Sequence, residues 1–307
     1  MCSMCIRIIL FVLCCMPILC SALVQCTPPG TCQCRRFRVP AITFPNYNFL
    51  ITNPVTTNVN ASIECRSRNA GGQSQISFEI SMAGDISGRT MSNGSNAITF
   101  NVFHPGSTTV VLGENANAYT YTGTVGDTYT VIPLSLPAEV FTGQNVPDGQ
   151  YQGFYVLTAT HPQNNNVRTR ARNRRFRVNV ERVCQVSATD INLGTYFATT
   201  TSPTTRPGTI TIQCTPNIMG SISANPGTGS SSYTNRVLSS GSNTINYNLY
   251  TNAGLTTIFG DGTGGSQSIS GTTTGGTQIT NYYASIPPGQ FDPVGTYSSN
   301  VVLTLNI

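Results

Sequence analysis

Very few side chains in this sequence have the types and the spacing that catalysis requires. The only histidines, His104 and His161, each precede a proline in a segment that is expected to be a loop. Neither a Gly-x-Ser-x-Gly nucleophile motif nor a His-Glu-x-x-His zinc motif occurs. The glycine-rich residues 260–265 are similar to a phosphate-binding loop, but no helix pattern follows them. We therefore expect no catalytic residue, no cofactor and no enzymatic activity.

Cysteine is the other reactive residue type, with eleven in the chain. Five lie in residues 1–22, which combine one arginine, a short apolar run and small residues at Ser21 and Ala22. This pattern predicts a secretory signal peptide that is cleaved after Ala22. Six cysteines then remain, and an even number in an oxidising compartment indicates disulfides.

Two pairs among these six cysteines have nearly the same spacing, 31 positions in the first half of the chain and 30 in the second. We expect one disulfide from each pair, with the remaining two cysteines bonded to each other. Exchange of Cys32 for Cys34 stays open. A metal site at these two residues is not expected, because no histidine lies near them and exported thiols oxidise. The predicted bonds are Cys34 to Cys65, Cys184 to Cys214 and Cys26 to Cys32.

All sixteen basic residues are arginine, and seven of them lie within residues 168–182. Such a density of positive charge could bind a nucleic acid or an anionic glycan. The simpler interpretation is the solvent-exposed face of a strand, whose charges discourage edge-to-edge pairing. No nucleic-acid partner is expected for an exported protein, whereas binding to an acidic surface polymer stays open.

The elements that position these residues occur twice in the chain. Residues 89–114 and 236–261 align without a gap at an offset of 147, and most differences between them conserve side-chain volume. A repeat of this length is a whole domain, so we expect two similar domains in series. The identical pairs are Arg89/Arg236, Ser92/Ser239, Gly94/Gly241, Ser95/Ser242, Asn96/Asn243, Ile98/Ile245, Asn101/Asn248, Thr109/Thr256 and Gly113/Gly260.

The composition indicates β-structure. Only 9% of the residues are charged, and short alternating runs are separated by Gly, Pro and Asn. We expect an all-β fold with two tandem β-sandwich domains. The predicted parts are the signal peptide at residues 1–22, an N-terminal domain at residues 23–182 and a C-terminal domain at residues 183–307.

The two repeats are expected to end differently. In the first, a strand at residues 151–160 is followed by another in which Phe176, Val178 and Val180 alternate with polar residues. In the second, the strand that matches residues 151–160 is not followed by another strand. The second domain is therefore expected to be incomplete, lacking its last strand. The residues expected along the edge of the resulting groove are Val301, Leu303, Leu305 and Ile307.

From Cys184 onward the sequence resembles a spore coat protein U domain, the pilin domain of archaic (Csu-type) chaperone-usher pili. One departure is Phe259, where the family commonly carries tryptophan. The first repeat resembles the family more loosely. The matching segments are residues 191–196 (INLGTY), 208–214 (GTITIQC), 246–250 (NYNLY), 259–262 (FGDG), 289–290 (GQ) and 295–297 (GTY).

The resemblance implies immunoglobulin-like sandwiches that are completed by a donated strand. The donor is first a periplasmic pilus chaperone and then, after passage through the outer-membrane usher, the adjacent pilus subunit. The residues before Cys34 are rich in proline, glycine and cysteine and are unfit to serve as such a strand. A subunit that accepts a strand but cannot donate one belongs at the pilus tip. The expected protein is thus a two-domain tip adhesin, exported through the periplasm to the cell surface, which binds an abiotic hydrophobic surface or a host receptor and promotes biofilm formation.

Differences between the repeats indicate where attachment resides. The first repeat carries the apolar residues 49–51 and the tyrosines after Glu114 where the second carries mainly Thr, Ser and Gly, and it inserts residues 139–142 before the shared Gly-Gln. Such side chains in loops at one end of a sandwich mark an interaction site, although residues 49–51 could instead extend a core strand. The alternative function is a structural pilus-shaft or spore-coat subunit without binding activity. The predicted adhesive loop residues are Phe49, Leu50, Ile51, Tyr119, Tyr121, Val140 and Phe141.

Overall fold

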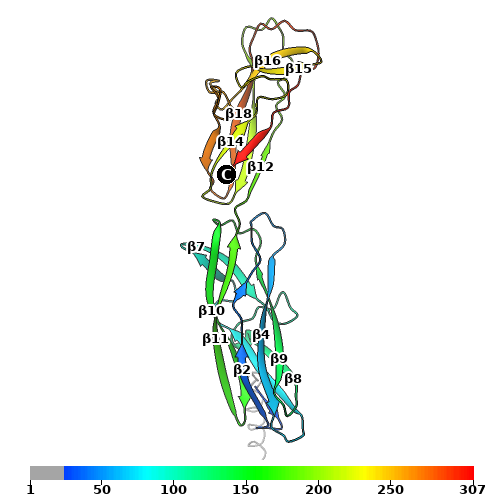
Figure 1. Cartoon of the computed structure of the whole chain (residues 1–307), viewed down its shortest axis with the longest axis vertical. Helices are drawn as coiled ribbons and strands as arrows, with labels where there is room; N and C mark the ends of the chain where they lie inside the picture. Colours follow the sequence, from blue (N-terminus) through cyan, green and yellow to red (C-terminus); the bar gives the residue numbers. More distant parts are fainter. Residues whose placement is uncertain (1–23) are drawn as a thin grey trace, which may run out of the picture. The chain divides into compact units, whose positions relative to one another are not determined.

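The computed structural model describes residues 24–307, so the predicted signal peptide lies outside the described residues. All regular elements in this range are β-strands apart from one 3-10 turn, Asn115–Asn117 (Figure 1). No helix within the described range is long and apolar enough to cross a membrane. The predicted all-β class is confirmed.

The chain divides into two compact units, which are described separately. The first contains the described residues up to Tyr47, with Ile51–Gln144 and Gly149–Asn179. The second contains Val180–Ile307, with the short segments Asn48–Leu50 and Asn145–Asp148. Two β domains were predicted from the repeat, and both are present.

Two groups of strands enclose the core of the first domain. In one group β2, β4, β9, β7 and β6 pair in this order, and in the other β8, β5, β10 and β11 do. Alternation along β5 buries Ile76, Phe78 and Ile80. The strands are β1 (Cys26–Thr27), β2 (Cys32–Arg38), β3 (Ile42–Thr43), β4 (Val55–Ser67), β5 (Ser74–Met82), β6 (Arg89–Asn93), β7 (Asn96–Val102), β8 (Tyr119–Val125), β9 (Thr130–Val140), β10 (Gly149–Gln163) and β11 (Asn166–Val180).

The second domain contains a five-stranded sheet, β12-β13-β18-β16-β15, and a three-stranded sheet, β17-β14-β19. Its core includes Tyr247, Leu249, Phe259 and Tyr282. Phe259 is fully buried, with its ring 6.0 Å from that of Tyr282. The strands are β12 (Cys184–Ala188), β13 (Thr204–Cys214), β14 (Met219–Ala224), β15 (Arg236–Ser240), β16 (Asn243–Tyr250), β17 (Ile269–Thr272), β18 (Thr277–Ile286) and β19 (Leu303–Asn306).

Each domain has its first long strand tied to the neighbouring strand by a disulfide. In the first domain the bonded cysteines lie directly opposite each other on β2 and β4, and in the second on β12 and β13. The bond therefore lies at the same place in both repeats. The three disulfides of the structure are Cys34–Cys65, Cys184–Cys214 and Cys26–Cys32.

A buried arginine holds the core of each domain together. Arg89 and Arg236 are 1% and 0% exposed, and burial lowers the pKa of both guanidinium groups. Each donates from Nη1 to an asparagine side chain of the neighbouring strand, at 2.9 Å to Asn101 and 2.8 Å to Asn248. Their other N–H groups bond to main-chain oxygens. For Arg89 these belong to Met82, Ala83 and Leu112, and for Arg236 to Asn225, Pro226, Tyr233 and Phe259.

Because these carbonyl groups are buried, removal of the guanidinium leaves several acceptors without a donor. We predict that Arg89→Met destabilises the first domain by roughly 3 to 5 kcal/mol. Arg89→Lys should lose most of this stability too, since an ammonium group cannot span the same acceptors. The measurement is a urea titration read by limited proteolysis, which reports each domain through its own fragments. Exposed Arg175→Met is the matched control and should stay within about 0.5 kcal/mol of the parent; equal effects of the two variants would contradict this role.

Candidate functional site

The last strand of the first domain is packed in place. β11 pairs with β10 on one side and in parallel with β3 on the other, where Phe176 lies opposite Ile42. Beyond β3, the amide of Phe44 donates to the carbonyl of Arg177 and the amide of Tyr47 to that of Asn179, both at 2.9 Å. The apolar residues of β11 that face the core are 4% exposed or less. These residues are Phe176, Val178 and Val180.

A tyrosine and a glutamine identify the matching segment of the second domain. The hydroxyl of Tyr47 accepts a hydrogen bond from the amide of Gln144 at 2.7 Å, and the hydroxyl of Tyr196 accepts one from the amide of Gln290 at 2.9 Å. Both glutamine side chains then donate to a main-chain carbonyl of the neighbouring strand, at Thr99 and Asn246. Residues 191–196 therefore correspond to residues 42–47.

Residues 191–196 form no strand, because a strand needs a hydrogen-bonded neighbour and no described strand pairs with them as β11 pairs with β3 in the first domain. Within residues 24–307, the amides of Leu193 and Tyr196 have no backbone hydrogen bond, whereas their counterparts Phe44 and Tyr47 do.

An apolar groove takes the place of this strand. One hollow of about 800 Å³ lies between residues 191–198 and 292–299, over Ile245 and Ile286. A second hollow of about 170 Å³ continues over Tyr247, Leu249 and Tyr282. The two hollows share lining residues and so form one groove, which we call the acceptor groove. The shared residues include Ile191, Leu193 and Leu238.

The four residues predicted for the groove edge lie in different surroundings. Val301 and Leu303 line the acceptor groove, and Leu305 packs partly buried against the core. Ile307 is 51% exposed and lines neither hollow, so its assignment to the groove edge was wrong. β19 pairs only with β14 among the described strands, which leaves its other edge open. The sequence analysis missed Ile191 and Leu193 as groove residues, although the match between residues 42–47 and 191–196 could have identified them.

Three of the predicted adhesive loop residues do not lie in loops. Val140 is the last residue of β9, fully buried and opposite Val55 and Phe100. Tyr119 and Tyr121 lie on β8, where Tyr121 stacks on Phe78 with ring centroids 4.7 Å apart. These side chains are apolar or aromatic because they pack on the core, so their assignment as adhesive loops was wrong.

The other four predicted residues lie outside the strands. Phe49 and Ile51 are half-buried, and Leu50 is 39% exposed with its amide bonded to Asn48. They follow Tyr47, which is hydrogen-bonded to Asn179 near the end of β11. Half-buried Phe141 precedes Gln144, which also contacts Tyr47.

The opposite end of the first domain, where β2 and β11 begin, is polar. Backbone hydrogen bonds connect the turns at this end. The amides of Arg68, Ser67 and Asn164 donate to the carbonyls of Thr31, Gly126 and Cys32, respectively. The turns at residues 28–31, 68–73, 126–129 and 164–165 contain no Val, Leu, Ile, Met or Phe. An apolar tip is therefore not formed at this end.

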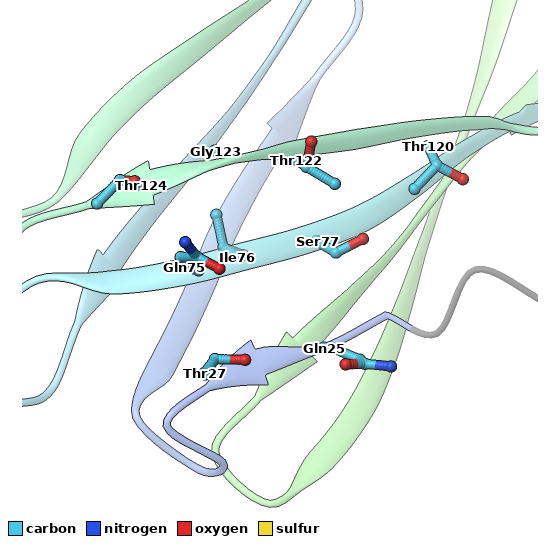
Figure 2. A pocket seen from close by; sticks show the side chains of 9 residues that line it. All are labelled: Gln25, Thr27, Gln75, Ile76, Ser77, Thr120, Thr122, Gly123 and Thr124. Carbon is cyan, nitrogen blue, oxygen red and sulfur yellow. The ribbon is translucent and has the colours of Figure 1, made fainter.

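Among residues 24–307, the structure brings no catalytic group together. His161 was predicted to lie in a loop, but it lies in β10 and is fully buried. Burial lowers the pKa of its imidazole, and the nearby Arg170 and Arg168 lower it further. A hollow of about 490 Å³ on β1, β5 and β8 is lined by hydroxyl and amide groups such as Thr122, Gln75 and Gln25, without a charged side chain (Figure 2). No group of three His, Cys, Asp or Glu side chains that could hold a metal ion is found within residues 24–307.

The presence of two similar β domains agrees with a comparison of sequence families. The model of the Spore Coat Protein U domain matches residues 18–158 and again residues 173–304. The chain belongs to the Spore Coat Protein U domain family. This match extends the resemblance seen in the second repeat to the first. The family comprises structural proteins rather than enzymes, in line with the prediction of no enzymatic activity.

Solved structures show a similar fold. The CsuC-CsuE chaperone-tip adhesion subunit complex from archaic Csu pili of Acinetobacter baumannii contains a chain that is 15% identical, with a TM-score of 0.56. The match covers 89% of this chain and 100% of that chain. The CupB6 tip adhesin from Pseudomonas aeruginosa is 10% identical with a TM-score of 0.36, and the match covers 90% of this chain and 94% of that chain. No curated protein matches the sequence.

The first domain indicates which strand would fill the acceptor groove. β10 and β11 are joined by a two-residue turn at Asn164 and Asn165, so a copy of residues 162–180 appended after Ile307 would fold back in the same way. We predict that this copy stabilises the second domain by at least about 3 kcal/mol, because it buries three apolar side chains. The measurement is the urea midpoint of the second-domain fragments.

A matched control carries serine in the appended copy at the positions of Phe176, Val178 and Val180. It retains the main chain but has nothing to place in the groove, so little stabilisation is expected. If the serine copy stabilised the domain as much as the apolar copy, the groove would not be the binding site.

Proposed function

We propose that this protein is the tip adhesin subunit of a chaperone-usher pilus. The observation that carries the proposal is the contrast between the domains. The first has its own final strand, whereas the second leaves the acceptor groove in the corresponding place. Strand addition would supply backbone hydrogen bonds to residues 191–196 and apolar side chains to Leu193 and its neighbours.

The segment before β2 supports a role as acceptor only. Gln25 exchanges two backbone hydrogen bonds with Ser77, and Cys26 lies opposite Ile76 in β5. The Cys26–Cys32 disulfide closes this segment onto the same domain. It is therefore engaged within its own domain and is not free to enter another subunit. A subunit that only accepts a strand ends a fibre.

The expected partners follow from this role. A periplasmic pilus chaperone would fill the groove before assembly, the outer-membrane usher would pass the subunit on, and the adjacent pilus subunit would replace the chaperone. The protein would then lie at the cell surface at the pilus tip, where the first domain promotes attachment and biofilm formation. The three disulfides suit export through an oxidising compartment.

For attachment, an apolar contribution is proposed only for Phe49, Leu50, Ile51 and Phe141, because Val140 is buried and Tyr121 stacks on Phe78. The alternative function, a structural shaft or spore-coat subunit, is disfavoured because the segment before β2 is bonded to β5 and closed by a disulfide within its own domain.

The position of the subunit in the fibre tests this function. We predict that an epitope-tagged chain, observed by immunogold electron microscopy, labels one end of each pilus. Leu193→Asp should remove the label from fibres, because a charge in the apolar groove blocks the incoming strand. Ile279→Asp makes the same change at a side chain that is 66% exposed outside the groove and should leave the label in place. Labelling along the fibre would instead support the shaft subunit.

A further inference from the structure

The segment between β2 and β3 crosses from one group of strands to the other. β2 pairs with β4, with an irregularity between Arg35 and Arg38, and β3 then pairs with β11. Within the irregularity of β2 and in the connection that follows it the ladder is interrupted, so carbonyl groups there need other donors.

Two arginines of β11 supply these donors. The Nε of Arg172 donates to the carbonyl of Phe37 at 2.9 Å, and the Nε of Arg174 donates to that of Val39. Their Nη1 atoms donate to the carbonyls of Ala171 and Asn173. Both guanidinium groups are therefore held in position by the main chain rather than moving freely in solvent.

These fixed guanidinium groups line an open groove of about 650 Å³, which we call the arginine groove. No acidic residue lines it. Arg36, from the opposite wall, lies 3.5 Å from Glu64, but that carboxylate also pairs with Arg35 at 3.0 Å, so it neutralises only part of the charge. The lining residues are Arg36, Phe37, Arg38, Val39, Pro40, Asn60, Ser62, Arg172 and Arg174.

The charge of the whole domain has the same sign as that of the groove. Residues 23–182 contain 13 arginines and 8 acidic residues, an excess of 5 positive charges. Only 9% of the chain is charged, so a groove with four arginines is a marked concentration. Such a groove focuses positive potential and attracts anionic ligands.

The chemistry of the groove favours an acidic polysaccharide over other polyanions as its ligand. Guanidinium forks bind carboxylate and sulfate groups with two parallel hydrogen bonds. Asn60 and Ser62 add amide and hydroxyl groups that can bond to sugar hydroxyls. The one aromatic residue of the lining, Phe37, is fully buried, so the groove has no ring on which nucleic-acid bases could stack.

We propose that the arginine groove of the first domain binds an acidic polysaccharide that carries carboxylate or sulfate groups. The groove is open and can accept a segment of a longer polymer, and Arg38 is exposed without an ion pair to any described residue, so its charge is available to the ligand. This ligand class adds to the proposed pilus role, and its binding does not depend on that role.

The test uses the full mature chain and two immobilised probes, heparin for sulfate and alginate for carboxylate, with neutral dextran as the uncharged control. The parent chain should bind both acidic probes in 0.15 M NaCl and should not bind dextran. Arg36→Gln combined with Arg38→Gln should weaken binding about tenfold, since two exposed charge contacts are lost. Higher salt should weaken binding further.

Arg175→Gln combined with Arg206→Gln is the matched control. It removes the same two charges from exposed positions outside the groove, and binding should change less than about twofold. Equal urea midpoints of both double variants and the parent would establish that all are folded. Equal weakening of heparin and alginate binding in the two double variants would overturn the assignment of the site to the arginine groove. Binding of the parent chain to dextran as strong as its binding to the acidic probes would overturn it too.

A competition experiment distinguishes a polysaccharide ligand from a nucleic acid. Single-stranded DNA that displaces heparin at a lower concentration than alginate does would overturn the polysaccharide assignment in favour of a nucleic-acid site. None of these outcomes depends on where the subunit lies in a fibre, so failure here and failure of the tip position are separate results.

Discussion

The fold depends most on the bond between one buried guanidinium group and the carbonyls around it, formed once in each domain. A charged group is tolerated in a core only when its donors are satisfied, and Arg89 and Arg236 each use three nitrogen atoms to meet this condition. Because the acceptors lie at strand ends and in connections, the bond holds segments that no ladder connects. In the second domain it joins the end of β14 to β16 and to Phe259. This arrangement gives the second domain a defined framework around the acceptor groove.

Most of the fold could be predicted from the sequence because its signals are local or repeated. Alternation identified most strands, and the match of residues 89–114 to 236–261 identified both domains and the pair Arg89 and Arg236, although not what the arginines do. Val140 was misplaced because the inserted residues around it were compared only with the other repeat. The alternation of Leu134, Leu136 and Ala138 continues to Val140 and could have shown that it is buried.

Contacts between distant segments could not be predicted in this way. Tyr121 packs on Phe78, 43 positions earlier, and nothing in the local pattern of β8 indicates this partner. His161 continues the buried face of Leu157 and Ala159, but the proline after it suggested a loop. The role of Arg172 and Arg174 depends on the crossing between β2 and β3, which requires the arrangement of three separate strands. The sequence could therefore indicate an arginine-rich strand but not a groove.

The two domains use one fold for different tasks. The first is closed by its own β11 and concentrates positive charge, whereas the second keeps an open apolar groove that is matched to an alternating strand. Amide hydrogen exchange at Leu193 and Tyr196, measured in the full chain with and without a peptide of residues 172–180, tests this account most directly. The account predicts rapid exchange in the free chain and strong protection with the peptide, while Phe44 and Tyr47 are protected throughout. Protection of Leu193 and Tyr196 in the free chain would contradict it, because the groove would then already be filled.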